Sequence, residues 1–102
     1  MRDEMARYIQ AGNLPDSVDD LALRRLFEAH GAVRSAVISR HVESGRSAGA
    51  GFVEMESEEG GTAAIAALHH LEYGGRVLSV CWSNPVLMNL IADRQRMFSS
   101  IA

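Results

Sequence analysis

Residues 46–55 read RSAGAGFVEM, and the last eight of them alternate between two kinds of side chain. Successive side chains of a strand point to opposite faces of its sheet, so odd and even positions separate. The odd positions from Gly49 to Met55 suit a core, and the even positions from Ala48 to Glu54 suit a surface. This stretch predicts a strand over 48–55 whose outer face carries one aromatic ring, Phe52.

Three further strands are predicted where apolar residues alternate or run between turn signals. They cover residues 8–11, 33–40 and 76–83. The Tyr73-Gly74-Gly75 stretch is expected to turn the chain into the last of them, which Pro85 would end. Alternation along that last strand places Trp82 in the core.

Two helices are predicted between these strands. The first is expected after Ser17, which has Asp20 at capping-box spacing, and it would stop at Gly31. The second is expected after Ser57 and would carry Ala64, Ile65, Leu68 and Leu71 on its apolar side. Two glycines, 60 and 61, lie in its first turn and would weaken it by about 1 kcal/mol each.

The order strand, helix, strand, strand, helix, strand predicts an α+β fold of the ferredoxin-like βαββαβ type. Right-handed crossovers would place both helices on one face of a four-stranded antiparallel sheet and leave the other face open. After Pro85 an extra amphipathic helix is predicted. The expected organisation is an N-terminal arm over 1–7, one domain over 8–84, and the C-terminal helix over 85–102.

Composition excludes several classes of protein. The net charge is −3, with 13 acidic residues against 10 arginines and no lysine, which argues against strong, non-specific phosphate binding. One cysteine, Cys81, allows neither a disulfide framework nor a zinc cluster. No catalytic pair, metal site, cofactor motif, signal peptide or membrane span is evident, and a cytoplasmic, non-enzymatic protein is expected.

Residues 8–83 resemble the RNA recognition motif family. The segment YIQAGNLP resembles the first-strand hexamer of that family, and ESGRSAGAGFVEM resembles the loop before its third strand together with the third-strand octamer. LRRLFEAHG resembles the end of the first helix, and AAIAALHHLEYGGRVLSVCWS the second helix and last strand. The resemblance implies binding of single-stranded RNA by stacking bases on aromatic residues of the first and third strands.

Carried over position by position, this aromatic platform is sparse. The hexamer's aromatic falls at Gln10, the octamer's basic residue at Ala48, and its first ring at Ala50, while its second ring is retained as Phe52. Two missing rings would cost about 2–6 kcal/mol of binding free energy, so weak binding is expected. The expected RNA-binding residues are Tyr8, Gln10, Asn13, Arg40, Arg46, Ala50, Phe52 and Cys81.

A second hypothesis remains open for the same fold. The outer sheet face would be apolar but poor in rings, and the C-terminal helix would carry an apolar stripe. The two surfaces could meet within one chain, between two chains as a homodimer, or through a protein partner. The stripe consists of Leu87, Leu90, Ile91, Met97 and Phe98.

Overall fold

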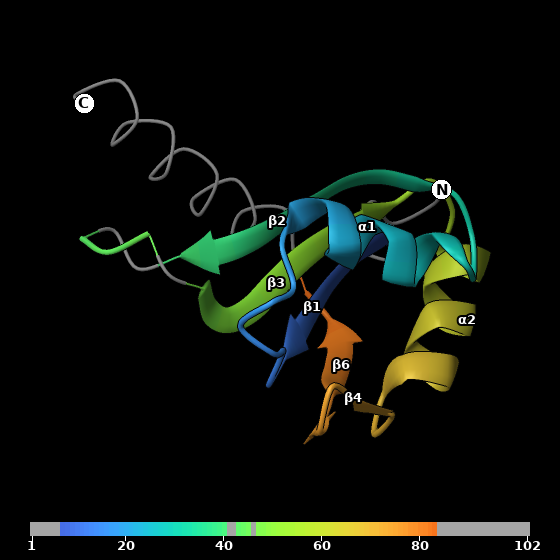
Figure 1. Cartoon of the computed structure of the whole chain (residues 1–102). Coiled ribbons are helices and arrows are strands. Elements are labelled where there is room, and N and C mark those ends of the chain that lie inside the picture. Colours follow the sequence, from blue (N-terminus) through green and yellow to red (C-terminus); the bar gives the residue numbers. More distant parts are fainter. Residues whose placement is uncertain (1–6, 41–42, 46, 84–102) are drawn as a thin grey trace.

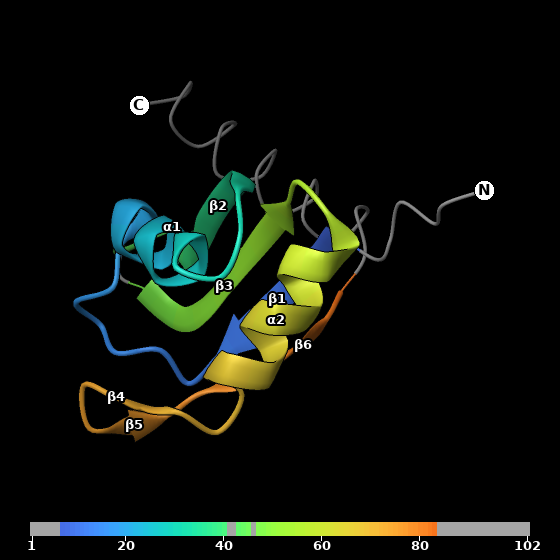
Figure 2. The same ribbon diagram turned by 90° about the vertical axis from the view of Figure 1, so that its right-hand side faces the viewer.

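The computed structural model of the chain describes residues 7–40, 43–45 and 47–83. Its sheet holds four antiparallel strands in the order β2-β3-β1-β6, and both helices cover one face of it (Figures 1 and 2). This is the predicted ferredoxin-like arrangement. In chain order the elements are β1 (Tyr8–Gly12), α1 (Asp20–Glu28), β2 (Val33–Arg40), β3 (Ser47–Met55), α2 (Glu58–Leu68), β4 (Glu72–Tyr73), β5 (Arg76–Val77) and β6 (Ser79–Trp82).

The core lies between the sheet and the two helices. Ile9 and Val53 occupy the middle of the inner sheet face, and both are fully buried. Leu23 and Phe27 of α1 close one side of this layer, and α2 contributes its own apolar stripe to the other. The rest of the cluster consists of Ala11, Leu14, Val18, Val33, Ile38, Met55, Ala64, Leu68, Leu78 and Val80.

The first helix begins later than predicted. Asp19, not Ser17, is its N-cap, since the Asp19 carboxylate accepts a 2.8 Å hydrogen bond from the Ala22 amide. The preceding residues form a turn in which the Val18 amide donates to the Pro15 carbonyl at 3.1 Å. The capping prediction for the second helix is confirmed: the Gly60 amide donates to Ser57 Oγ at 3.1 Å.

The two glycines at the start of α2 bring it close to its neighbours. A Cβ on Gly31 would lie 2.8 Å from Gly60 Cα, and a Cβ on Gly61 would lie 2.8 Å from the Trp82 ring. The expectation for Trp82 needs correction, because its side chain is 42% exposed. It lies on the inner side of the edge strand β6, opposite Ile9, with its ring beside Gly61 of α2.

The chain between α2 and β6 also differs from the prediction. The second helix ends at Leu68, and Leu71 is 39% exposed beyond it. The expected strand over 76–83 is divided: residues 76–77 pair with β4 in a separate hairpin, and only β6 joins the main sheet. Gly74 and Gly75, both with positive φ, make the tight turn of that hairpin.

His69 links the end of α2 to β6. Its Nδ1 accepts a 3.0 Å hydrogen bond from the amide of Val80, a buried residue. Replacing His69 by alanine is expected to lower the free energy of unfolding by about 1–3 kcal/mol, because the amide loses its acceptor. Urea denaturation followed by circular dichroism measures this change.

His70→Asn is the matched control. The His69 and His70 rings stack at 3.8 Å, so both substitutions remove the stack. His70 has a φ of 71°, which asparagine tolerates, and only the His69 substitution removes the acceptor. Equal urea midpoints for the two variants would contradict the assigned hydrogen bond.

Candidate nucleic-acid interface

Strand register arranges the open face of the sheet in three rows across β2, β3, β1 and β6. Gln10 pairs with Phe52 on one side and with Cys81 on the other, and Phe52 pairs in turn with Val37. The middle row is therefore Val37, Phe52, Gln10 and Cys81. The row at one end is Ser39, Ala50, Gly12 and Ser79, and the row at the other end begins with Ser35, Glu54 and Tyr8.

Phe52 occupies the centre of this face. Its neighbour Val53 belongs to the core, so the Phe52 ring projects from the opposite side of the sheet. The ring is nevertheless only 8% exposed, and it does not belong to the core cluster. The sequence predicted the position of this ring correctly but did not predict how deeply it is covered.

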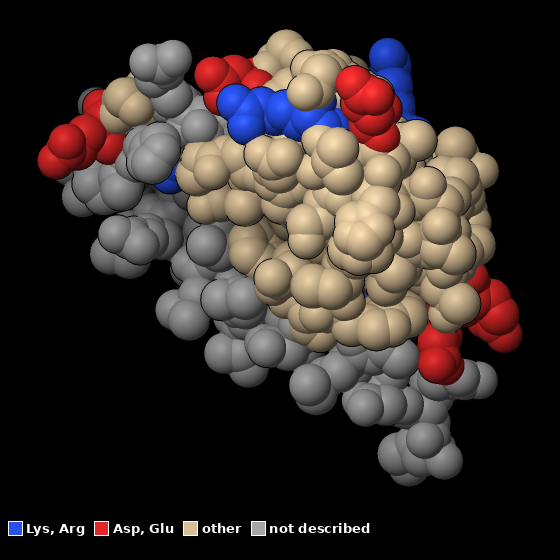
Figure 3. Space-filling model, turned by 90° about the horizontal axis from the view of Figure 1, so that it is seen from below, with Lys and Arg blue, Asp and Glu red and all other residues tan. Residues whose placement is uncertain are grey.

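Charge is scarce on the open face. Among the residues of the three rows, Glu54 is the one charged side chain, and it pairs with Arg34 at 3.4 Å. The end of the molecule that carries the β4–β5 hairpin also has a mostly uncharged described surface, with charged groups along its margins (Figure 3). An open sheet face with a single charged side chain in its three rows suits stacking and hydrogen bonding, and phosphate contacts would have to come from its edges.

Two polar residues meet at the Gly12 end of the sheet. Asn13, which follows β1, has a φ of 61° and donates from Nδ2 to the Val77 carbonyl at 2.9 Å. Its Oδ1 accepts a 2.9 Å hydrogen bond from Arg76 Nη1. Asn13 is among the residues predicted to bind RNA and Arg76 is not, because 63 residues separate the two in the chain.

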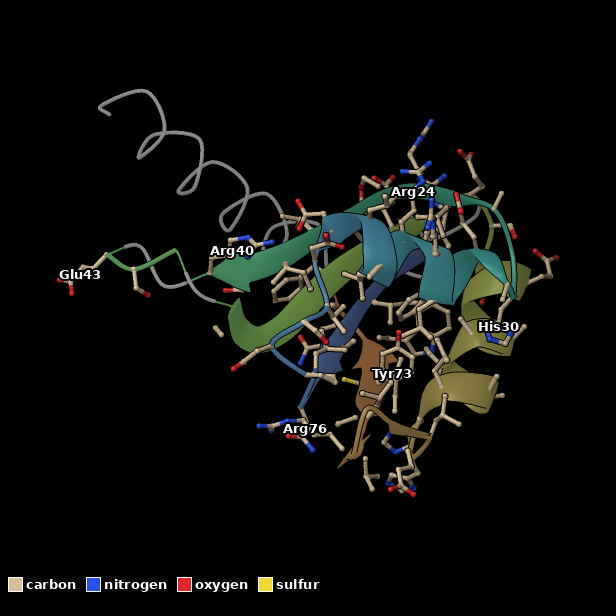
Figure 4. All side chains as sticks on the ribbon, in the orientation of Figure 1. Arg24, His30, Arg40, Glu43, Tyr73 and Arg76 are labelled. Carbon is tan, nitrogen blue, oxygen red and sulfur yellow. The ribbon has the colours of Figure 1, made fainter. Side chains whose placement is uncertain are left out.

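Arg40 lies at the outer edge of β2 and not over the rows. Its guanidinium is 3.9 Å from an Asp20 oxygen of α1 and 3.5 Å from the Gly45 carbonyl. Figure 4 shows Arg40 at the tip of β2 and Arg76 well apart from it, on the β4–β5 hairpin. Arg46, the other arginine expected to bind RNA, lies outside the described residues.

A bulge interrupts the start of β3. The pairing with β2 shifts between Ser39 and Arg40, and Gly49 has a φ of 78°. The Gly49 carbonyl accepts a 2.9 Å hydrogen bond from the Leu14 amide, which joins β3 to the segment after β1. The alternation predicted over 48–55 is therefore regular only from Ala50 onward.

Other features of the described chain bear on chemistry. Within residues 7–40, 43–45 and 47–83, no three histidine, cysteine or acidic side chains are grouped as a metal site. Cys81 is exposed and forms no disulfide within the described residues. No helix in that part of the chain is long and apolar enough to cross a membrane. The predicted C-terminal stripe and the arm over residues 1–6 lie outside it.

Comparisons with known proteins agree with this geometry. The chain matches the RNA recognition motif family over residues 10–79. It is 46% identical over 77 residues to the chloroplast RNA-binding protein CP31B of Arabidopsis thaliana, which covers 76% of this chain and 27% of CP31B. It is 43% identical over 77 residues to RbpE of Nostoc, which covers 76% of this chain and 78% of RbpE.

A solved Sxl-lethal protein/RNA complex has the same fold. It superposes with a TM-score of 0.73 at 29% identity, covering 76% of this chain and 48% of that one. This chain spans about a quarter of CP31B, and the chloroplast location belongs to that protein's name. The cytoplasmic location expected here stays a prediction. The family match covers most of the described residues, and the chain belongs to the RNA recognition motif family.

Proposed function

We propose that this chain binds single-stranded RNA across the open face of its sheet. RNA binding as such follows from the family and from its RNA-binding relatives. The strand register supports the particular face: it places Phe52 between Val37 and Gln10 on a surface with little charge. An aromatic ring in the middle of such a sheet offers a stacking platform that any base can use.

The residues of the open face that are expected to contact RNA have distinct roles in this proposal. The Phe52 ring stacks on one base, and the Gln10 amide, with donors and an acceptor, pairs with the edge of a neighbouring base. Cys81 and Ala50 are small, so they let the nucleic acid approach the backbone. Tyr8, half-buried in the Glu54 row, supplies a second ring at the margin. With one central ring, the affinity is weak.

Fluorescence anisotropy tests the proposal. A labelled random pool of short single-stranded RNA is titrated with the full chain at low salt, and the same strands in duplex form serve as the comparison. The expected result is saturable binding of the single strands that exceeds binding of the duplex, because only unstacked bases can reach Phe52. Equal binding of both forms, or none, would contradict the proposal.

The burial of Phe52 favours a second candidate role for the same face. Phe52 is covered, and Ser83 Oγ at the Tyr8 end of the face is buried without a hydrogen-bond partner. We propose that the apolar stripe of residues 85–102 packs on this face and competes with RNA. The support is this burial together with the amphipathic sequence after Pro85.

Substituting the stripe tests that competition. Leu90→Glu together with Ile91→Glu places charge where the stripe would meet an apolar face, so RNA is expected to bind more tightly than to the unchanged chain. Anisotropy with the same RNA pool measures the change, and Asn89→Glu with Gln95→Glu, which adds the same two negative charges, is the off-stripe control. Unchanged affinity in the stripe variant would exclude the competition. Sedimentation velocity at several concentrations separates a contact within one chain from a homodimer.

A further inference from the structure

We infer that Arg76 is a phosphate-binding residue for the RNA and that Asn13 positions it. This inference rests on the proposed function. It adds a binding residue outside β1 and β3, the two strands on which the family resemblance places the RNA-binding residues. It concerns the Gly12 end of the sheet, where β1 ends and the β4–β5 hairpin packs against the segment that follows it (Figures 2 and 4). The ligand group is a phosphodiester of the strand whose base stacks on Phe52.

The Asn13 side chain uses both of its polar groups to hold this end together. Its Nδ2 donates to the Val77 carbonyl at 2.9 Å, and its Oδ1 accepts from Arg76 Nη1 at 2.9 Å. Its backbone is left-handed, with a φ of 61°, a conformation that asparagine adopts more readily than most residues. Within the described part of the chain, the Arg76 guanidinium is thus bonded through one of its five donors, which leaves the others for a ligand.

The backbone that carries Arg76 is fixed as well. Arg76 pairs with Tyr73 across the two-residue turn Gly74-Gly75. A Cβ on Gly74 would lie 2.8 Å from Pro15 Cγ, so the turn is in close contact with the segment after β1. The Leu78 amide also donates to the Leu71 carbonyl at 2.9 Å. A binding residue on a braced hairpin loses little conformational entropy when a ligand arrives.

Among the described residues, no carboxylate forms an ion pair with Arg76. Three other described arginines lie beside carboxylates: Arg24 with Glu28 at 2.9 Å, Arg34 with Glu54 at 3.4 Å, and Arg40 with Asp20 at 3.9 Å. Arg76 instead bonds to a neutral amide, and it is exposed. The acid on the same hairpin, Glu72, is paired in register with Val77. A guanidinium without a carboxylate partner is suited to a phosphate.

The distribution of charge along the strands favours binding of the RNA backbone at the Gly12 end of the sheet over the Tyr8 end. The Tyr8 row contains Glu54, which repels phosphate, while the Gly12 row consists of small, uncharged residues and ends beside Arg76. Asn13 follows Gln10 by three residues, about 10 Å along an extended chain. A base over Phe52 and Gln10 therefore places its backbone within reach of the Gly12 end, where Asn13 holds the Arg76 guanidinium.

The salt dependence of binding tests Arg76 directly. For single strands, the slope of log K against log salt is about −0.7 per neutralised phosphate. Arg76→Gln is expected to make the slope less negative by about 0.7, and Arg76→Lys to restore most of it. Asn13→Gly keeps the left-handed backbone and the Arg76 cation but removes the side chain that positions the cation. At a fixed salt concentration it is expected to weaken RNA binding, whereas Arg76→Lys is expected to keep most of the affinity.

Arg25→Gln is the matched control. Arg25 is exposed on α1, which covers the opposite face of the sheet, and its removal changes the net charge equally. It should leave the slope as in the unchanged chain. If Arg76→Gln and Arg25→Gln give equal slopes, Arg76 only ties the hairpin and the inference is overturned. If the unchanged chain binds no single-stranded RNA, the proposed function itself fails. Thermal unfolding of each variant confirms that it folds.

Discussion

Replacing Phe52 by leucine is expected to weaken binding of single-stranded RNA by about 1–3 kcal/mol, or about 5- to 150-fold in Kd. Leucine fills much of the same apolar volume, so the 8% exposed position stays covered and the fold is kept. What it removes is the π-face on which a base stacks. Anisotropy titration with the RNA pool at one low salt concentration measures the effect.

Val37→Ala provides the control for that substitution. Val37 pairs with Phe52 in the same row, so it lies on the same face and loses apolar volume without losing a ring. The affinity of Val37→Ala for RNA should change by less than the affinity of Phe52→Leu. Phe52→Tyr should stay near the unchanged chain, because it keeps the ring. If the leucine and tyrosine variants bind alike, stacking on Phe52 is not the basis of recognition.

Gly51→Val is expected to destabilise the fold more than any surface change. A Cβ at Gly51 would lie 2.7 Å from Leu23 Cδ2 and 3.1 Å from Ile38 Cδ1, both in the core. Excess volume in a packed core costs about 1–3 kcal/mol, and two more methyl groups on this Cβ place the effect at the upper end. That is a large part of the stability of a domain of this size. Urea denaturation gives the difference.

Gly12→Val is the matched comparison for the core substitution. Gly12 also lies in the sheet, but its added Cβ would be 3.8 Å from the nearest atom, an ordinary contact. Its free energy of unfolding should remain close to that of the unchanged chain. The packing argument fails if the two valine variants unfold at the same urea concentration.

Alternation predicted the faces of the sheet because burial imposes a strict period of two. The partners Gln10 and Phe52 were expected on the open face, and register places them side by side. The start of α1 was harder to predict, because Ser17 and Asp19 both suit an N-cap. The turn at Pro15–Val18 decides between them, since it leaves Asp19 as the last residue before the helix.

Features that depend on contacts between distant segments could not be read from local patterns. Trp82 alternates like a core residue, but it lies on the edge strand β6 and stays 42% exposed although its ring is beside Gly61 of α2. The division of the last strand depends on Gly74 packing against Pro15, and Arg76 gains its position from Asn13. The low exposure of Phe52 is a similar case: strand alternation predicts which face of the sheet a side chain occupies, but not how deeply it is buried there.

Amide chemical shifts of the full chain, labelled with nitrogen-15, test the central claim most directly. Short single-stranded RNA is added at low salt, and the shifts are followed residue by residue. The open-face account predicts the largest changes at Gln10, Ala50, Phe52 and Cys81, with Ala63 and Ala66 on the exposed side of α2 unaffected. Changes confined to α2, or no saturable change at any residue, would contradict RNA binding by the open face.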